Sequence, residues 1–468
     1  MDLSTGLREQ AAPRTHAVMA EIRRRIASRA LPPGARLPSV RSLAKAMNVS
    51  TSTVVEAYDR LVAEDAVRSR PGSGFYVANA FAPLSLADLG PRLDRAIDPF
   101  WVSRLALEAG ENMAKPGCGW MPASWMPQEA MRRAMRTMLR GDDAQLSDYS
   151  TPLGLLPFRE LLARRLYEQG TVAGTEQIIL VDSGTHAIDL LCRFLLEPGQ
   201  TVLVDDPCYF NFHALLRAHR VKVIGIPYLP DGPDVAQFEQ AVSDHQPRLY
   251  ITNSGIHNPT GAALSPMTAH RILMMTERAG MTVIEDDIFA DLDEQKAPRL
   301  TALDGLRRSV QIGSFSKTLS ASARCGYIAA PKAWIEPLTD IKIATTFSGN
   351  QMNERIVFSA LTDVHYRRHM DSVKTRLSHV RLDVASRLRG VGITPFIDPT
   401  AGIFLWCRLP QGVDAAAVAR YALTKNMVLA PGSIFSQTPA SSNFMRFNVS
   451  QCDCPDMIDI LQAGMASA

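Results

Sequence analysis

The sequence predicts a small helical module at the N-terminus, a linker, and a large α/β domain that ends in a smaller α+β part. Three observations predict this order. Residues 14–79 carry a surplus of basic side chains, helical stretches alternate with short β-rich runs from about residue 106, and a long charged helix over 366–389 begins a different pattern after about residue 363. The bounds that we expect are 14–79 for the module, 80–105 for the linker and 106–466 for the large domain.

Composition limits the classes of protein to which the chain can belong. The 468 residues have a formal net charge of +3, but residues 14–79 hold eleven Lys and Arg against five Asp and Glu. A basic surplus at one end indicates a nucleic-acid-binding module on a body that does not bind nucleic acid. The seven cysteines show no paired framework, and Cys452-Asp-Cys454 lacks a second pair of ligands, so we expect a reducing cytoplasm and no metal site. Because the sequence has no signal pattern and no apolar stretch of about 18 residues, we expect neither secretion nor membrane insertion.

The N-terminal module has the pattern of two closely joined helices followed by a hairpin. We expect a first helix over 17–28, a second helix capped by Ser39, and a third helix that opens at Ser50. Asn48 stands where a left-handed turn residue is needed between the second and third helices, which predicts a helix-turn-helix. Turn residues 71–74 then separate a basic run from a β-prone run, so a two-stranded wing should follow.

Residues 15–79 resemble the GntR-type winged helix-turn-helix, because the stretch that ends at Ala44 matches that family's Pro-x-Gly-x-x-Leu-Pro-Ser-x-Arg-x-Leu-Ala string. The resemblance implies that the module binds a double-stranded DNA operator. The residues that it places toward DNA are Ser39, Arg41, Thr51, Ser52, Thr53, Arg70, Gly72, Ser73 and Gly74. Many relatives carry arginine where this chain has Thr51, so we expect weaker or different base readout from the third helix. A helical bundle that binds protein is the alternative, and the basic wing argues against it.

Short β-rich runs predict one large, mostly parallel central sheet in the domain after residue 106. Two later runs, 402–406 and 445–449, belong to the smaller α+β part. In open α/β sheets, ligands bind beyond the carboxyl ends of the strands, so the residues that follow each strand are the candidates for a site. The strands that we expect in the central sheet are 177–181, 201–204, 221–226, 248–252, 282–284, 309–312 and 326–329.

The stretch 314–327 carries the strongest signal for chemistry. It follows an apolar run and contains Lys317 between hydroxyl side chains, with Arg324 seven residues later. A Schiff base with the aldehyde of pyridoxal phosphate needs an amine that burial keeps unprotonated, and the dianionic phosphate needs hydroxyls and a guanidinium. A lysine among serines is by itself more often a solvated loop, but the full string with Arg324 and Gly326 is far more specific.

Residues 110–465 resemble the fold type I aminotransferases, because Ser314-Phe-Ser316-Lys317 and Arg324-Cys-Gly326 match their Ser-x-Ser-Lys and Arg-x-Gly signature. The resemblance implies that the cofactor is pyridoxal 5′-phosphate and that Lys317 forms the Schiff base with it. The residues that it assigns to the cofactor phosphate are Ser314, Ser316, Arg324, Gly184, Thr185 and His186. It also implies that Asp286 pairs with the pyridine nitrogen, Asn258 donates to the 3-oxygen, and Tyr209 stacks on the ring.

Two further residues follow from the same resemblance. Arg446 corresponds to the family arginine that grips a ligand α-carboxylate, so the ligand should be an amino acid or amine; the alternative is a salt bridge within the smaller part. Tyr149 corresponds to the residue that reaches the partner subunit's phosphate, which implies a homodimer. The tyrosine that follows the acid motif in aminotransferases is missing, because Ile288 and Phe289 occupy its place. The loss of that hydroxyl favours a sensor over a fast catalyst.

A winged helix joined to an aminotransferase-like body resembles the MocR subgroup of GntR bacterial regulators over nearly the full length. The resemblance implies a cytoplasmic, nucleoid-associated regulator that binds pyridoxal phosphate, responds to an amino compound and is not an enzyme, although half-transamination is compatible with it. Two alternatives stay open. One is a working aminotransferase that carries a DNA module, which turnover with an amino donor and a keto acid would reveal. The other is a DNA-binding protein whose body has lost the cofactor, against which Lys317 and Asp286 argue.

Overall fold

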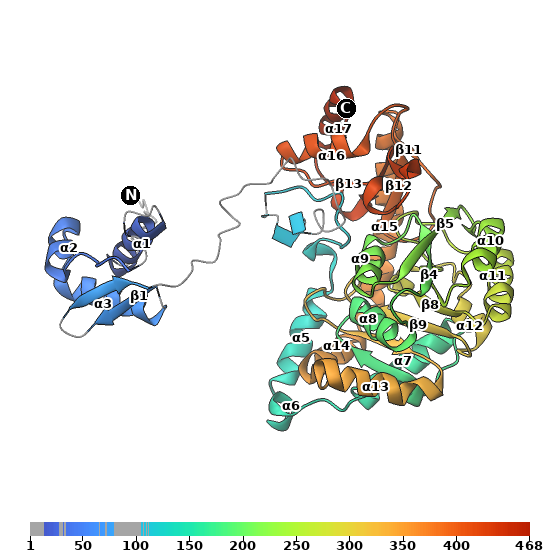
Figure 1. Ribbon diagram of the computed structural model, residues 1–468, viewed down its shortest axis with the longest axis horizontal. Coiled ribbons are helices and arrows are strands. Elements are labelled where there is room, and N and C mark those ends of the chain that lie inside the picture. Colours follow the sequence, from blue (N-terminus) through green and yellow to red (C-terminus); the bar gives the residue numbers. More distant parts are fainter. Residues whose placement is uncertain are drawn as a thin grey trace, which may run out of the picture. The chain divides into compact units, whose positions relative to one another are not determined.

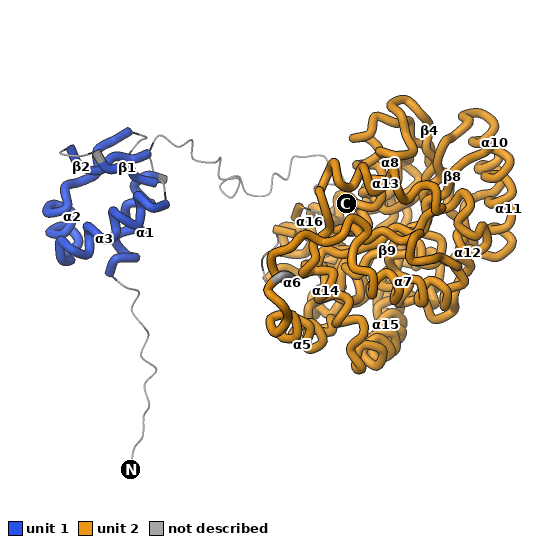
Figure 2. Tube along the Cα trace, turned by 90° about the horizontal axis from the view of Figure 1, so that it is seen from below, with its two compact units in different colours: residues 1–94 blue, residues 95–468 orange. Residues whose placement is uncertain are grey.

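The computed structural model of the chain describes residues 14–27, 31, 34–64, 66–70, 73–78, 104–105, 107–108, 110 and 112–468. The chain divides into two compact units, residues 1–94 and 95–468 (Figure 2). The linker expected over 80–105 lies almost entirely outside the described residues, and the expected domain bounds stay a prediction. None of the helices in the described part of the chain combines the length and the apolar character that a membrane span requires.

The N-terminal unit contains the three helices and the hairpin that the sequence predicts. Its elements are α1 (Arg14–Ala27), α2 (Val40–Met47), α3 (Thr51–Ala63), β1 (Val67–Arg70) and β2 (Gly74–Val77). The helices pack on a core that includes Ile22, Leu43 and Tyr58. The Tyr58 hydroxyl donates a hydrogen bond of 2.9 Å to the carbonyl oxygen of Pro38 and so holds the start of α2 against α3. The strands β1 and β2 pair antiparallel, with Val67 opposite Val77.

The caps of α2 and α3 lie where the sequence predicts them. The Ser39 hydroxyl accepts a hydrogen bond from the Ser42 amide at 3.2 Å, and the Ser50 hydroxyl accepts one from the Thr53 amide at 3.1 Å. Asn48 adopts the left-handed conformation at φ 52° and ends α2. Helix α1 begins at Arg14, three residues before the expected start.

The C-terminal unit is built on an eight-stranded sheet, which contains all seven strands that the sequence predicts. The additional strand, β6, has two residues and lies at one edge, where it extends the turn after β5. Strand β10 is antiparallel to both of its neighbours, β3 and β9, whereas the strands from β9 to β5 run parallel. The order across the sheet is β3 (Ile178–Val181), β10 (Gly326–Ala329), β9 (Ser309–Ser314), β8 (Thr282–Asp286), β7 (Leu249–Thr252), β4 (Thr201–Asp206), β5 (Lys222–Leu229) and β6 (Gly232–Pro233).

Helices cover both faces of this sheet, which explains why its strands are apolar runs without alternation. One face packs on α8 (Gly184–Leu195), α9 (Phe210–Ala218) and α13 (Lys332–Thr346). The other face packs on α7 (Leu156–Glu168), α10 (Val235–His245), α11 (Pro266–Arg278) and α12 (Leu300–Asp304). Strand β3 shows the division, because Ile179 and Val181 face α8 while Ile178 and Leu180 face α7.

The C-terminal part of this unit has its own sheet, as the change of pattern after residue 363 predicts. The long helix α15 (Tyr366–Arg389) has the predicted bounds. It leads into a four-stranded antiparallel sheet in the order β11 (Thr394–Pro395), β12 (Phe404–Arg408), β14 (Phe444–Asn448) and β13 (Ala430–Pro431). Figure 1 shows this sheet with α16 (Ala415–Thr424) and α17 (Met457–Ser467) in orange and red. Before the central sheet, the chain forms α5 (Gln128–Met138) and α6 (Ala144–Ser147), and α14 (Gln351–Leu361) precedes α15.

Candidate cofactor site and nucleic-acid interface

One cavity of about 420 Å³ collects most of the residues that the sequence assigns to a cofactor and its ligand. It lies where the parallel strands end, because β9 ends at Ser314 and β8 ends at Asp286. The predicted residues that line it are Gly184, Thr185, Tyr209, Asn258, Asp286, Ser314, Ser316, Lys317, Arg324 and Arg446. Two predicted residues, His186 and Tyr149, do not line it.

The start of α8 and the hydroxyls of the 314–316 turn form one end of the cavity. Ser183 caps α8 by accepting the His186 amide at 3.0 Å, and the Ser314 hydroxyl lies 3.0 Å from that of Ser316. A Cβ atom on Gly326 would lie 2.7 Å from the Gly313 carbonyl oxygen and 3.2 Å from the Gly184 amide nitrogen, so only glycine lets β10 pass this closely. Amides at a helix start, hydroxyls and the Arg324 guanidinium suit an anion such as phosphate.

Lys317 reaches into the centre of the cavity. Its Nζ donates a hydrogen bond of 2.7 Å to the carbonyl oxygen of Gly119. Burial lowers the pKa of Lys317 to about 8, and the positive charge of Arg446 acts in the same direction. A larger fraction of this amine is therefore neutral and nucleophilic near neutral pH than for an exposed lysine.

Side-chain alternation separates three consecutive acids at the end of β8, of which Asp287 directly follows the strand. Asp286 faces the cavity, whereas Glu285 and Asp287 lie on the opposite side of the strand. Glu285 accepts the amides of Leu300 and Thr301 at 2.7 and 2.9 Å. Asp287 is 5% exposed and forms a bidentate ion pair with Arg299 at 3.0 and 3.1 Å. The charge of Asp287 is therefore compensated inside the protein.

Some polar groups of the cavity lack a hydrogen-bond or ion-pair partner among the described residues. Burial raises the pKa of Asp286 to about 7, and its carboxylate has no ion pair within the described part of the chain. The Asn253 Oδ1 and the Arg446 Nε are buried without a hydrogen-bond partner there. A ligand with a cationic ring nitrogen, an oxyanion and a carboxylate would satisfy such groups, so the residues present fit the predicted cofactor and ligand.

Arg446 is 1% exposed and is held by neutral groups. Its Nη1 donates to Asn258 Oδ1 at 2.9 Å and its Nη2 donates to the Gly117 carbonyl oxygen at 2.8 Å. The guanidinium lies over the rings of Phe404 and Phe435, at 4.1 and 4.6 Å from their centroids. Burial lowers the pKa of Arg446 to about 10. Because no ion pair with it occurs among the described residues, the alternative of an internal salt bridge does not hold, and the charge stays available to a ligand carboxylate.

Sequence reasoning missed two parts of this cavity. Asn253 directly follows β7, and its Nδ2 donates to the Asp286 carbonyl oxygen at 2.9 Å. The strand-end rule that found Asp286 could also have found Asn253. The segment 117–120 supplies the carbonyl oxygens that hold Lys317 and Arg446. It comes from a stretch without hydrophobic period, so nothing in its pattern indicated a role.

The two predicted residues outside the cavity have other surroundings. The imidazole of His186 turns back toward Asp182, with Nδ1 at 3.5 Å from its Oδ2, because side chains in a first helical turn point toward the helix start. The assignment of His186 to the phosphate is therefore not supported by its placement. Tyr149 is 75% exposed, and its ring meets the edge of Phe347 at 4.9 Å between centroids. Its predicted role concerns a partner subunit and stays a prediction.

The residues predicted to face DNA divide into exposed groups and structural ones. Arg41, Thr51 and Ser52 are exposed, whereas Thr53 is half-buried. Ser39 uses its hydroxyl as the cap of α2. In the wing, the Ser73 hydroxyl lies 2.6 Å from the Tyr76 hydroxyl and Gly74 has φ 103°. Gly72 and the side chain of Arg70 lie outside the described residues.

Five basic side chains of the N-terminal unit are exposed and form no ion pair with the described part of the chain. They are Arg14, Arg36, Arg41, Lys45 and Arg68. In contrast, Arg24 and Arg60 pair with glutamates on their own helices. The Arg36 guanidinium lies beside the wing, because a Cβ on Gly74 would be 3.5 Å from its Nε. Cations without a carboxylate partner are those that DNA phosphates can engage.

Comparison with known families covers both units. The family model described as "Aminotransferase class I and II" matches residues 121–463. The model described as "Bacterial regulatory proteins, gntR family" matches residues 14–77.

Several curated proteins are similar to nearly the whole chain. The chain is 27% identical over 460 residues to the "Uncharacterized HTH-type transcriptional regulator YdfD" of Bacillus subtilis, which covers 95% of this chain and 94% of that protein. It is 24% identical over 419 residues to the "HTH-type transcriptional regulator NorG" of Staphylococcus aureus, with coverage of 87% and 94%.

Solved structures share the fold of the C-terminal unit. An α-aminoadipate aminotransferase, LysN from Thermus thermophilus, superposes with a TM-score of 0.71 at 22% identity and covers 80% of this chain and 96% of its own. An archaeal alanine:glyoxylate aminotransferase superposes with a TM-score of 0.72 at 22% identity, with coverage of 78% and 93%. At this identity the likeness shows the fold alone.

Proposed function

Because the chain belongs to the aminotransferase class I and II family and carries a gntR-family module at its N-terminus, we propose that it is a transcription regulator of the MocR type. The module binds an operator in double-stranded DNA, and the aminotransferase-like unit senses an amino compound through pyridoxal phosphate. One observation carries the proposal: the chain that presents unpaired cations on a winged helix-turn-helix also gathers Lys317, Asp286 and Arg446 in one cavity. Relatives named as transcriptional regulators match over the same length.

Pyridoxal phosphate, when bound, supplies an aldehyde that captures amines. Lys317 supplies the amine that attaches it to the chain. The carboxylate of Asp286 keeps the ring nitrogen charged, Asn258 donates to the ring oxygen, and Tyr209 covers the ring. The groups that hold the phosphate are Ser314, Ser316, Arg324 and the amides at the start of α8.

The effector in this proposal is an amino acid, or an amine that carries a carboxylate. Lys317 would hold the cofactor that captures the effector's amine, and Arg446 would bind its carboxylate through the buried guanidinium, which the described residues leave without a counter-charge. Ligand capture thus joins a residue of β14 to residues at the end of the central sheet, so it can change how the two parts of this unit close on each other.

The regulator acts as a homodimer in the cytoplasm under this proposal. Tyr149 and Phe347 form an exposed aromatic pair, with 75% and 61% of their surfaces accessible. Aromatic side chains this exposed are typical of surfaces that a partner covers. In the dimer, Tyr149 reaches the cofactor phosphate of the partner subunit.

A working aminotransferase that carries a DNA module is the second candidate, because the cavity retains the lysine, the acid and the arginine of a catalyst. Against it, Ile288 and Phe289 line the cavity where aminotransferases have a tyrosine, and Phe289 packs edge-on against Phe404 at 5.6 Å. Turnover of an amino donor and a keto acid at about 1 per second or faster would favour this candidate.

We test the regulator function by mapping the DNA bound by the full chain across its host genome and measuring affinity for the recovered sites. We expect a few discrete sites and an affinity that changes when an amino acid effector is added. Uniform, low-affinity binding to all sequences would contradict an operator-specific regulator.

Attachment of pyridoxal phosphate to Lys317 should depend on pH. Burial lowers the pKa of the amine from 10.5 to about 8, so the protonated form dominates below that pH and the neutral form above it. We expect the rate of covalent attachment to the cofactor-free protein to rise about tenfold per pH unit below 8 and to level off above it. Rapid-mixing absorbance between about pH 6.5 and pH 9.5 measures this rate. A rate that still rises steeply at the upper end would show that Lys317 titrates like an exposed lysine.

Removal of one cation from the N-terminal unit should weaken DNA binding and flatten its salt dependence. The slope of log affinity against log salt concentration is negative. In Arg41→Ala we expect its magnitude to decrease by about 0.9, the value for one lost phosphate contact. Arg193→Ala is the matched control, because Arg193 is an exposed helical arginine of the other unit and pairs with Asp189. Fluorescence anisotropy at several salt concentrations measures both slopes. Weaker binding with an unaltered slope would assign Arg41 to base readout or folding.

A further inference from the structure

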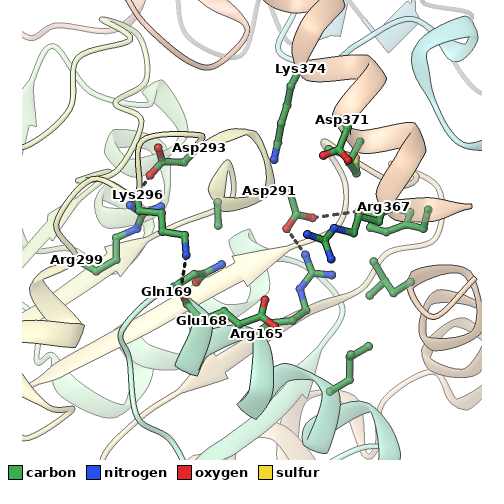
Figure 3. Close-up of a pocket in the computed structure, with 15 residues that line it drawn as sticks. Arg165, Glu168, Gln169, Asp291, Asp293, Lys296, Arg299, Arg367, Asp371 and Lys374 are labelled. Carbon is green, nitrogen blue, oxygen red and sulfur yellow. Dashed lines mark hydrogen bonds and ion pairs between the residues drawn. The ribbon is translucent and has the colours of Figure 1, made fainter. Parts of the chain in front are cut away.

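A second cavity, of about 610 Å³, lies outside the cofactor site. Its walls come from α7, from the loop after β8, and from the first turns of α15, so it sits where the central sheet meets the long helix. Figure 3 shows Lys374 extending from α15 into this cavity while Lys296 approaches from the loop. The volume is in the range that small-molecule sites occupy.

Some of the charged side chains that line this cavity form ion pairs, and others do not. Arg165 pairs with Asp291, and Arg299 pairs with Asp287 and Asp293. The other three cations, Lys296, Arg367 and Lys374, form no ion pair with any described residue. Two acids of the wall, Glu168 and Asp371, have none there either, so the lining carries five cationic and four acidic side chains. Three uncompensated cations against two uncompensated acids favour a ligand with net negative charge.

The paired charges of this wall connect it to the residues that hold the cofactor. Asp291 accepts hydrogen bonds from Tyr366 at 3.1 Å and from Thr318, the residue after Lys317, at 3.2 Å. Arg299 holds Asp287, the residue after Asp286. A narrow void of about 20 Å³, large enough for one water, shares Arg165 and Asp291 with this cavity. The same void shares Ser314 and Ile288 with the cofactor cavity.

We propose that this cavity is a second effector site, which binds a small organic anion bearing carboxylate or phosphate groups. Lys296, Arg367 and Lys374 bind the anionic groups. An anion bound between the loop and α15 attracts these cations and changes the balance of charge around Asp291. Asp291 accepts a hydrogen bond from Thr318 and thereby positions the backbone of the adjacent Lys317. The site does not depend on the amino compound that the cofactor cavity captures, so its binding can be measured whether or not the proposed function is correct.

Calorimetric titration of the full chain with succinate and, separately, with inorganic phosphate tests the binding. Arg446→Gln loaded with pyridoxal phosphate is the background, because Arg446 offers a competing carboxylate site and the cofactor occupies the phosphate-binding groups of the other cavity. We expect one saturable site per chain, and the tighter of the two probes identifies the anionic group. Lys374→Gln and Lys296→Gln should each raise Kd at least tenfold, about 1.4 kcal/mol. Lys374→Arg should keep the affinity within threefold, because it keeps the charge.

Lys332→Gln is the matched control, since Lys332 is an exposed lysine of the same unit and pairs with Glu176 outside the cavity. It should bind the probe like the background chain. Absence of saturable binding, or an equal loss in Lys332→Gln, would overturn the site. The effector role is tested by the attachment rate of pyridoxal phosphate at Lys317, which saturating probe should change at least threefold more in the otherwise unaltered chain than in Lys374→Gln, because direct competition in the cofactor cavity is the same in both chains. Binding without any change in that rate would overturn the effector role.

Discussion

Lys317→Ala is expected to abolish covalent attachment of pyridoxal phosphate while the chain stays folded. Among the described residues that line the cavity, Lys317 alone supplies an amine, whereas the phosphate-binding groups at Ser314, Arg324 and the start of α8 remain in the variant. The wild-type protein, reduced with borohydride, should gain the mass of one cofactor per chain, and the variant should gain none. Intact-mass spectrometry measures the difference, and visible absorbance follows the same change.

Lys317→Arg separates covalent capture from charge. Arginine keeps the positive charge near Asp286 but does not form the bond, so this variant should bind the cofactor reversibly and release it on dialysis. Circular dichroism verifies the fold of both variants. A full equivalent of cofactor mass on Lys317→Ala would remove this residue from the site and direct attention to another lysine.

Arg446→Ala is expected to weaken the binding of amino acid effectors by about 30-fold or more. The truncation leaves a ligand carboxylate buried without its partner, a loss that typically costs about 2–5 kcal/mol. The corresponding amine, which differs from the amino acid only in lacking the carboxylate, is the control ligand. Its Kd values for the wild-type protein and for Arg446→Ala should agree within threefold. The change in visible absorbance of the bound cofactor during titration with each ligand gives both affinities.

Arg446→Lys controls for the charge alone. Lysine offers a point charge in place of the planar fork, so its effect should be intermediate. Because Arg446 packs between Phe404 and Phe435, thermal unfolding must accompany each measurement. An equal loss of affinity for the amine and the amino acid would mean that Arg446 shapes the cavity and does not recognise the carboxylate.

The elements with the strongest local signals could be predicted closely from the sequence. Ser39 and Ser50 cap their helices as expected, and α15 has the predicted bounds, because capping hydroxyls and helical period act within a few residues. The strands β8 and β9 each run two residues beyond their predicted ends, since their final polar residues pair with neighbouring strands. The two-residue strands β6, β11 and β13 depend on tertiary pairing and gave no periodic signal.

The site could be predicted where it follows strand ends or matches a motif, and not where it depends on packing. Lys317 and Asp286 come together as their positions near strand ends indicated, and Asn258 joins them as the family resemblance implied. The direction of His186 depends on the first turn of α8, and the role of segment 117–120 depends on a long-range approach to β14 that leaves no local pattern. The contact between Gly117 and Arg446 joins residues 329 positions apart, so a single sequence cannot indicate it.

The alternation of the three acids at the end of β8 determines which sequence changes this protein can accept there. Substitution of Asp286 changes the groups that contact a ligand in the cavity. Substitution of Glu285 or Asp287 changes the buried hydrogen bonds and ion pair behind the strand, so ligand binding and stability can vary separately. A one-residue insertion or deletion within β8 would exchange the two roles, because it turns every following side chain to the other face. It would remove one of the two buried carboxylates that pair with Arg299 and bring a scaffold acid into the cavity. Descendants of this gene should therefore diverge through point substitutions in this strand, while changes of length collect in the loops.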